Sequence, residues 1–181
     1  MVQGIKERYE KKVVPEMKKI FGYRNDLAVP KIKKVIVNTG FGSKKDEKEK
    51  IENIKKSLML ITGQWPAVNP AKKSISTFKL RKGMPIGFSA TLRRKRMDDF
   101  LEKLINVALP RTRDFRGINT GAIDKSGNLT IGIKEHIVFP ETSNEDIRNV
   151  FGLGITIVTT AKTKEEATEL FRLLGFPFSQ K

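Results

Sequence analysis

Apolar residues recur every three or four positions at the start of the chain, which is the spacing of an amphipathic helix. The apolar positions in this segment are Ile5, Tyr9, Val13, Met17, Ile20 and Phe21. Pro15 lies among them, and a proline removes a backbone donor and clashes with the preceding turn. The pattern therefore predicts an opening helix that is kinked or restarted at Pro15.

A second helical pattern begins near residue 46. Asp46 and Glu49 have the spacing of a capping box, in which each side chain bonds the other residue's backbone N–H. The apolar residues that follow on one face are Ile51, Ile54, Leu58 and Ile61. Gly63 supplies a left-handed end, so we predict a helix that stops there.

Two more helices are predicted further along the chain. Asp98 or Asp99 is expected to start a helix that ends at Pro110. Thr163 and Glu166 again have capping-box spacing, and they predict a last helix that runs through Leu173 and is closed by Gly175. Residues 144–150 are compatible with one short additional helix.

Short segments rich in β-branched residues predict the strands. They lie at 33–40, 88–93, 128–138 and 155–161. The stretch 67–96 is turn-rich, with glycines and prolines near its middle, and is typical of a hairpin with a protruding loop. Because strands and helices do not alternate regularly, we predict an α+β fold. Its mainly antiparallel β-sheet has helices packed on one face and carries a protruding basic loop, in a single domain over residues 1–181.

The net charge of the chain indicates which class of partner it binds. The 181 residues carry a formal net charge of +16, and 31% of them are charged. A polyanionic partner is expected, either nucleic acid or an anionic membrane. Membrane is the weaker alternative, because no apolar run approaches the roughly 18 residues of a spanning helix and residues 1–12 lack the apolar core of a secretory signal. The chain has no cysteine, hence no disulfide or cysteine metal site, and we expect a soluble, cytoplasmic protein.

Acidic residues are missing from one long segment. From Asn53 to Met97 there is no Asp or Glu, and the segment holds eleven cations. They are Lys55, Lys56, Lys72, Lys73, Lys79, Arg81, Lys82, Arg93, Arg94, Lys95 and Arg96. A basic surface kept only for solubility is one interpretation. Solvated helices usually mix the two signs, however, so phosphate neutralisation is the interpretation that we favour.

The same segment also offers hydrogen-bond donors and an aromatic ring. Ser74, Ser76 and Thr77 can donate to phosphates or 2′-hydroxyls, and Phe78 can stack on an unpaired base or belong to the core. No helix-turn-helix or zinc-finger pattern provides a reader of the DNA major groove. The combination favours RNA over duplex DNA.

Catalytic patterns are poor by comparison. Gly40-Phe41-Gly42-Ser43-Lys44 follows a strand but lacks the spacing of a phosphate-binding loop, so a phosphate-handling enzyme is only a rival hypothesis. The single histidine, His136, lies in a predicted strand and cannot build a triad or a metal site alone. We therefore predict a protein that is not an enzyme and has no metal and no cofactor. A general RNA chaperone without a fixed target remains a second rival.

Several ordered segments resemble large-subunit ribosomal protein five in its bacterial form. The resemblance begins at 37–42 (VNTGFG) and continues through 58–74 (LMLITGQWPAVNPAKKS) and 78–93 (FKLRKGMPIGFSATLR). It extends over 108–117, 136–141, 155–162 and 175–178, which is nearly the whole chain with matching spacing. It implies a protein that binds 5S ribosomal RNA and helps attach it in the central protuberance. It also implies contacts with large-subunit rRNA, with P-site transfer RNA and with a small-subunit ribosomal protein at an inter-subunit bridge.

The resemblance also implies which residues meet ribosomal RNA. Asn38, Thr39, Gly40, Gln64, Thr91 and Arg93 match family residues on the sheet face and its edges that meet 5S RNA. Lys72, Lys73, Ser74, Phe78, Lys79 and Arg81 match the basic segment that leads into the loop. Lys34 and Arg94 complete the predicted set of rRNA contacts.

Two further sets are implied to face other partners. Lys82, Gly83, Met84 and Pro85 match the loop tip directed at transfer RNA. Arg111, Arg113, Arg116, Glu141 and Arg148 match the surface that faces the small subunit. The chain departs from the family at four positions. Asn69 stands where the family commonly has a hydroxyl residue, and Pro70 where it has a polar or basic one. Trp65 replaces a basic or polar residue, and Arg94 replaces a glycine. We expect Trp65 to cover the core.

Overall fold

The structure of the chain is a computed structural model that describes residues 4–42, 47–113, 115–143 and 150–179. Five strands form one sheet: β1 (Ile32–Gly40), β2 (Ala67–Pro70), β3 (Pro85–Leu92), β4 (Leu129–Ile133) and β5 (Leu153–Thr159). Their order across the sheet is β2-β3-β1-β5-β4, and every neighbouring pair is antiparallel. The predicted α+β fold with an antiparallel sheet is confirmed.

The helices arise from the patterns described above. The opening helix runs as α1 (Ile5–Arg8), a π-helical turn (Tyr9–Val13) and α2 (Val14–Phe21), with Pro15 in the first turn of α2. The helix α3 (Lys48–Thr62) ends at Gly63, whose φ of 68° is left-handed. The helix α6 (Lys164–Leu174) has the predicted capping box of Thr163 and Glu166 and ends at Gly175. Asp46 and the segment 144–149 lie outside the described residues, so their predicted cap and helix stay predictions.

Two predicted boundaries were wrong. The helix α4 (Lys95–Lys103) begins before Asp98, and it continues through a π-helical turn (Leu104–Ala108) into α5 (Leu109–Arg111), whose first turn contains Pro110. The strand predicted over 128–138 stops at Ile133, and His136–Val138 forms a 3-10 turn instead. A helix start without a capping side chain, and a turn made of β-branched residues, leave no clear signature in the sequence.

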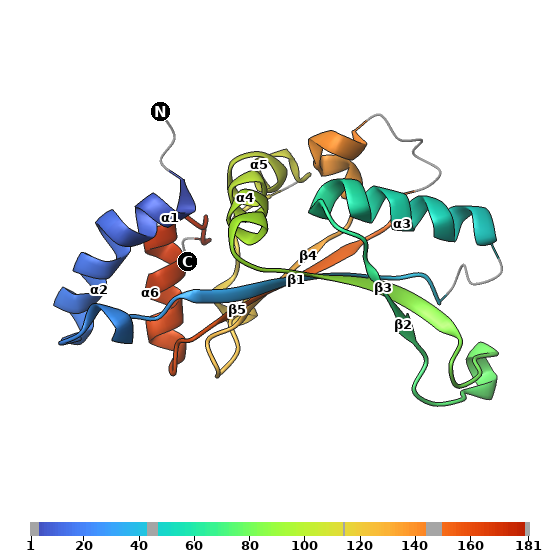
Figure 1. Ribbon diagram of the computed structural model, residues 1–181, viewed down its shortest axis with the longest axis horizontal. Helices are drawn as coiled ribbons and strands as arrows, with labels where there is room; N and C mark the ends of the chain where they lie inside the picture. The colour runs from blue at the N-terminus through green and yellow to red at the C-terminus, as the bar shows by residue number, and fades with distance from the viewer. Residues whose placement is uncertain (1–3, 43–46, 114, 144–149, 180–181) are drawn as a thin grey trace.

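Only one face of the sheet is buried. In β1 and β5, the residues of alternate positions are buried, including Val35, Val37, Ile155 and Ile157. The helices α3, α4 and α5 cover this face, while α1, α2 and α6 gather at one end of the sheet (Figure 1). Within the described ranges, no α-helix lies over the opposite face (Figure 1). This arrangement matches the predicted one-sided packing.

The chain between β2 and β3 extends away from the sheet, on the side opposite α3, α4 and α5 (Figure 1). This segment, residues 71–84, is the protruding basic loop that the sequence predicts. Its residues from Lys72 to Lys79 are exposed without interruption. Among the described residues, no helix is long and apolar enough to cross a membrane.

Candidate nucleic-acid interface

The uncovered side of the sheet, which we call the open face, carries small and polar side chains. Strand pairing aligns them in rows, because directly opposed residues of an antiparallel pair point to the same side. Asn38 is paired with Ser89 on one neighbour and with Gly154 on the other. Thr156 lies between Ile36 and Thr130 in the next row, and Thr91 lies beyond Ile36. A surface of this kind is flat and rich in hydrogen-bonding groups.

Hydrogen bonds hold several of these side chains in place. The Ser89 hydroxyl donates to Oδ1 of Asn69 at 3.0 Å. Thr130 Oγ1 and Thr156 Oγ1 are hydrogen-bonded at 3.2 Å, and either hydroxyl can be the donor. Gln64 Nε2 donates to the Thr91 carbonyl at 3.0 Å, which ties the segment after α3 to the edge of the sheet. The open face is therefore ordered before any partner binds.

Most of the sheet residues predicted to contact RNA lie on or beside the open face. Asn38, Gly40 and Thr91 are exposed there, Lys34 and Gln64 are half-buried, and Arg93 is exposed just after β3. The exception is Thr39, which is only 5% exposed and points to the helix-covered side. Its hydroxyl donates to the Gly152 carbonyl at 2.8 Å. The Thr39 side chain is therefore not part of the open face.

The cations of the acid-free segment lie on three elements: the protruding loop on the open side of the sheet, α3 on the helix-covered side, and the β3–α4 junction between them (Figure 1). Lys55 and Lys56 lie on α3, five cations lie on the protruding loop, and Arg93 to Arg96 lie at the junction of β3 with α4. All are exposed except Lys55, which is half-buried. Leaving Lys79 aside, none of them takes part in an ion pair within the described part of the chain. Their charge is thus available to a polyanion.

The protruding loop is a continuation of the β2–β3 hairpin. Ala71 and Met84 are hydrogen-bonded across its base, and Ser74 Oγ accepts a bond from Lys82 N at 3.0 Å. Ile75 and Leu80 bond each other through both backbone groups at 3.0 Å. The far end is the 3-10 turn Ser76–Phe78 with Lys79, whose φ is 50°. Here Phe78 is 65% exposed, so it is not a core residue.

This geometry corrects the predicted position of the tip. Lys82, Gly83, Met84 and Pro85 do not form the end of the loop: Gly83 N donates to the Ala71 carbonyl at 2.9 Å, and Pro85 is the first residue of β3. They form the neck of the loop. The resemblance implied a tip at Lys82 to Pro85, whereas the turn is made by Ser76–Phe78 without glycine or proline.

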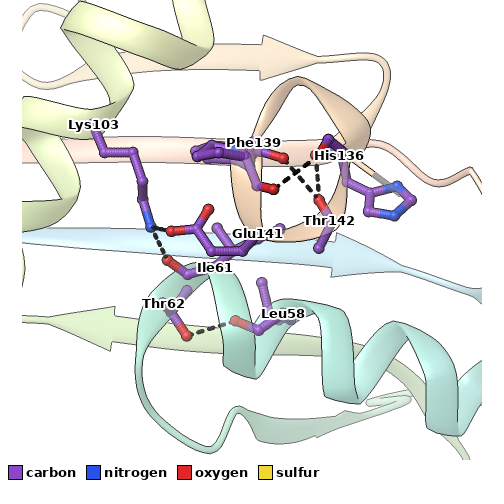
Figure 2. Close-up of polar contacts among 10 residues, drawn as sticks. Leu58, Ile61, Thr62, Lys103, His136, Phe139, Glu141 and Thr142 are labelled. Atoms are coloured by element: carbon purple, nitrogen blue, oxygen red, sulfur yellow. Dashed lines mark hydrogen bonds and ion pairs between the residues drawn. The ribbon is translucent and has the colours of Figure 1, made fainter. Parts of the chain in front are cut away.

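Glu141 forms internal contacts. Figure 2 shows Lys103 of α4 between Glu141 and the end of α3: its Nζ donates to Glu141 Oε1 at 2.5 Å and to the Ile61 carbonyl at 2.8 Å. The neighbouring Thr142 hydroxyl donates to the His136 carbonyl at 2.9 Å, which closes the turn. Glu141 therefore holds the turn Pro140–Thr142 against α3 and α4.

The other residues implied to face the small subunit follow α5. Arg111, Arg113 and Arg116 are exposed. Arg113 and Arg116 line a cavity of about 650 Å³ together with Phe115, Lys134 and Glu135. Arg148 lies outside the described residues.

Trp65 and His136 differ from their sequence-based interpretations. Trp65 is 62% exposed, so it does not cover the core as expected. His136 is fully buried, and its ring stacks on Phe151 with centroids 3.9 Å apart, which makes it a packing residue in a turn rather than a strand residue. Of the weak glycine pattern after β1, Ser43 and Lys44 lie outside the described residues.

Three polar residues of the open face were not singled out in the sequence. They are Ser89, Thr130 and Thr156. Each alternates with buried apolar residues along its strand, as in Leu129-Thr130-Ile131. That alternation is the signal that identifies a solvent-facing side of a strand, but it does not show which strands share that side.

A polar open sheet face with exposed cations on the adjoining loop and strand end is typical of nucleic-acid-binding proteins. Residues 25–81 match the family model described as ribosomal protein L5, and residues 85–178 match the model described as the C-terminus of the same ribosomal family. The chain belongs to the ribosomal protein L5 family. It is accordingly a ribosomal protein and not an enzyme, located on ribosomes in the cytoplasm, as predicted.

Individual relatives are similar over almost their whole length. The large ribosomal subunit protein uL5 of Thermus thermophilus is 52% identical over 175 residues, which cover 97% of this chain and 96% of the relative. The protein of the same name from Caldanaerobacter subterraneus is 51% identical over 97% of this chain and 98% of its own. The protein of the same name from Dictyoglomus turgidum is 52% identical over 99% of this chain and 100% of its own.

Proposed function

We propose that this protein is a structural constituent of the large ribosomal subunit that binds 5S ribosomal RNA and helps attach it in the central protuberance. Residues 1–181 act as one RNA-binding domain in this proposal. The open face and its edges bind 5S RNA through Lys34, Asn38, Gly40, Gln64, Thr91, Arg93 and Arg94, and Thr39 takes part only through its backbone. The cations of the protruding loop neutralise phosphates of 5S or large-subunit rRNA.

The open face is the observation that supports this proposal best. Folded RNA is recognised largely by its shape, by its 2′-hydroxyls and by its phosphates. The open face offers donors and acceptors to sugars and base edges, with Asn38 and Ser89 in one row and Thr91 in the next, while the exposed cations of the loop and of the β3–α4 junction supply most of the affinity.

The remaining surfaces are assigned to two further partners. The protruding loop, with Lys82 to Pro85 at its neck and Phe78 at its tip, is directed at P-site transfer RNA. The exposed Arg111, Arg113 and Arg116 face a small-subunit protein at an inter-subunit bridge. Glu141 contributes there by fixing the turn at Pro140–Thr142 through Lys103, and Arg148 completes the proposed set.

Filter binding of the full chain to 5S RNA tests the central claim. Six to ten phosphate contacts predict that affinity falls by roughly a thousandfold or more between about 50 and 200 mM salt. Arg93→Gln is expected to weaken binding by about 1–3 kcal/mol, because it removes a charge-assisted contact. Arg172→Gln is the matched control, since this arginine lies on α6 and is paired with Glu169 at 3.0 Å.

Competition separates this function from its rivals. Unrelated RNA in excess is expected to leave the 5S complex in place, whereas a chaperone without a fixed target would release 5S RNA to the competitor. Affinity that does not change with salt, or an Arg172→Gln effect equal to that of Arg93→Gln, would contradict the proposed interface.

A further inference from the structure

Trp65 lies exposed at the edge of the sheet that carries the open face. It is the only tryptophan in the chain, and 62% of it is exposed to solvent. A tryptophan offers a large apolar surface of about 150–250 Å² and is therefore costly to leave in water. Its exposed ring is therefore a surface that a partner of suitable chemistry can cover.

The neighbours of Trp65 place it next to the proposed RNA interface. Gln64, which precedes it, is bonded to the Thr91 carbonyl of β3 at 3.0 Å. Pro66, which follows it, is buried, and Ala67 is paired with Ser89 on the open face. Trp65 itself lies outside β2, in the connection between α3 and β2, and its ring contacts Lys55 of α3.

Cations adjoin the ring. Lys55 Nζ lies over the indole, 5.0 Å from the ring centroid, and so covers one of its faces by a cation–π contact. Arg96 Nη1 donates to Gln64 Oε1 at 3.5 Å, which brings a second charge beside the same segment. Both cations belong to the acid-free stretch 53–97. An apolar ring bordered by positive charge fits a ligand that is flat and negatively charged.

A nucleotide has these two properties. Its base stacks on an aromatic ring irrespective of sequence, and its phosphate is attracted to neighbouring lysine and arginine. A protein partner would favour an apolar surround rather than a cationic one, so the charges decide between the two classes.

We propose that Trp65 is a stacking platform for an unpaired base of the bound ribosomal RNA, with Lys55 holding the indole and neutralising the adjacent phosphate. This inference rests on the proposed function and adds a base contact to an interface otherwise made of phosphate and sugar contacts.

The single tryptophan makes the test direct. The full chain is titrated with 5S RNA while tryptophan emission is recorded, and the dissociation constants of variants are measured by filter binding. Saturating 5S RNA is expected to quench the emission. Trp65→Leu is expected to weaken binding roughly five- to hundredfold, and Trp65→Phe to restore most of the affinity. Leu60→Ala is the control, because Leu60 is an apolar residue of α3 that is 52% exposed.

The outcomes distinguish the two claims. Tight, salt-dependent binding by the unchanged chain together with constant emission and an unaltered Trp65→Leu variant would overturn the stacking platform and leave the proposed function standing. A chain that does not hold 5S RNA against competitor RNA would overturn both. Fully paired duplex RNA serves as a further probe: it is expected to bind through phosphates without quenching, and quenching by duplex would refute base stacking.

Discussion

At the scale of single residues, Arg94 shows a conflict between backbone and side chain. It is the N-cap of α4 with φ 52° and ψ −138°, a conformation that suits glycine and costs other residues about 1–3 kcal/mol. Its side chain is exposed and makes no capping bond. The guanidinium forms no capping bond that would offset this strain, and the proposed function assigns it a phosphate contact instead.

Arg94→Gly is expected to affect folding and binding in opposite directions. Relief of the backbone strain raises the free energy of unfolding by about 1 kcal/mol after the glycine entropy is subtracted, while the lost charge weakens 5S RNA binding. Urea unfolding and filter binding measure the two effects. Lys95→Gly removes the same charge at a helical position and is expected to lower the unfolding free energy instead. Equal changes of the unfolding free energy in Arg94→Gly and Lys95→Gly would show that the backbone of Arg94 is not strained.

Gly87 is a second residue with a strict requirement. A Cβ at this position would lie 2.7 Å from the Thr39 carbonyl oxygen and 3.6 Å from the Gly40 Cα, both backbone atoms of β1. Because a paired strand cannot give way as a flexible side chain does, Gly87→Ala is expected to lower the unfolding free energy by about 1–3 kcal/mol in urea denaturation. Gly132→Ala meets nothing within 4 Å and is expected to leave stability nearly unchanged. If Gly87→Ala left the free energy of unfolding unchanged, the β1–β3 pair would have to move apart easily enough to accept the added methyl group.

At the scale of elements, the sequence predicted those that have explicit end signals. Thr163 with Glu166 and Gly175 located α6, and Gly63 located the end of α3. The start of α4 was missed because its N-cap is Arg94, which makes no side-chain bond and so resembles any surface cation. The end of β4 was missed because Ile137 and Val138 continue a strand-like composition into a turn. The residue types alone do not show that the chain turns at His136 so that its ring becomes buried.

Glu166 of the α6 capping box also bonds Tyr23, which follows α2, and so connects α6 to the segment after α2. Glu166 Oε2 accepts from Lys162 N at 2.8 Å and Thr163 N at 3.3 Å, and Tyr23 OH donates to Oε1 at 2.5 Å. Burial raises the pKa of Glu166, but the bonds from Tyr23, Lys162 and Thr163 outweigh it, and the pKa lies below its usual value. The ionised form is thus the one that stabilises the fold.

Glu166→Ala is expected to lower the unfolding free energy by about 1–2 kcal/mol near neutral pH. A depressed carboxyl pKa contributes stability above the ordinary pKa, and this contribution is lost as pH falls through the folded-state pKa. The gap between the unchanged chain and the variant should therefore shrink in acid, as measured by urea unfolding across pH. Glu165→Ala, an exposed neighbour in the same first turn, is the control. A gap independent of pH would contradict the role of the charge.

At the scale of the whole molecule, the sequence predicted that a surface free of acids exists but not where it lies. The eleven cations belong to α3, to the loop and to the β3–α4 junction, and their positions in space depend on the tertiary pairing that gives the sheet order β2-β3-β1-β5-β4. Asn38 and Thr156 come from strands far apart in sequence, and their register depends on tertiary pairing. The exposure of Trp65 was likewise invisible, since an apolar residue after a helix resembles core.

The net charge of +16 gives salt two opposite effects on this molecule. The free protein repels itself, and screening shortens the reach of that repulsion to about 8 Å near 0.15 M salt. Added sodium chloride is therefore expected to raise the melting temperature of the free chain by a few degrees while it weakens RNA binding. Thermal unfolding of the free chain over a salt series, in parallel with filter binding, checks both. A melting temperature that falls with salt would contradict this expectation. It would mean that attraction within ion pairs such as Lys103–Glu141 contributes more to the stability of the free chain than repulsion among its cations subtracts.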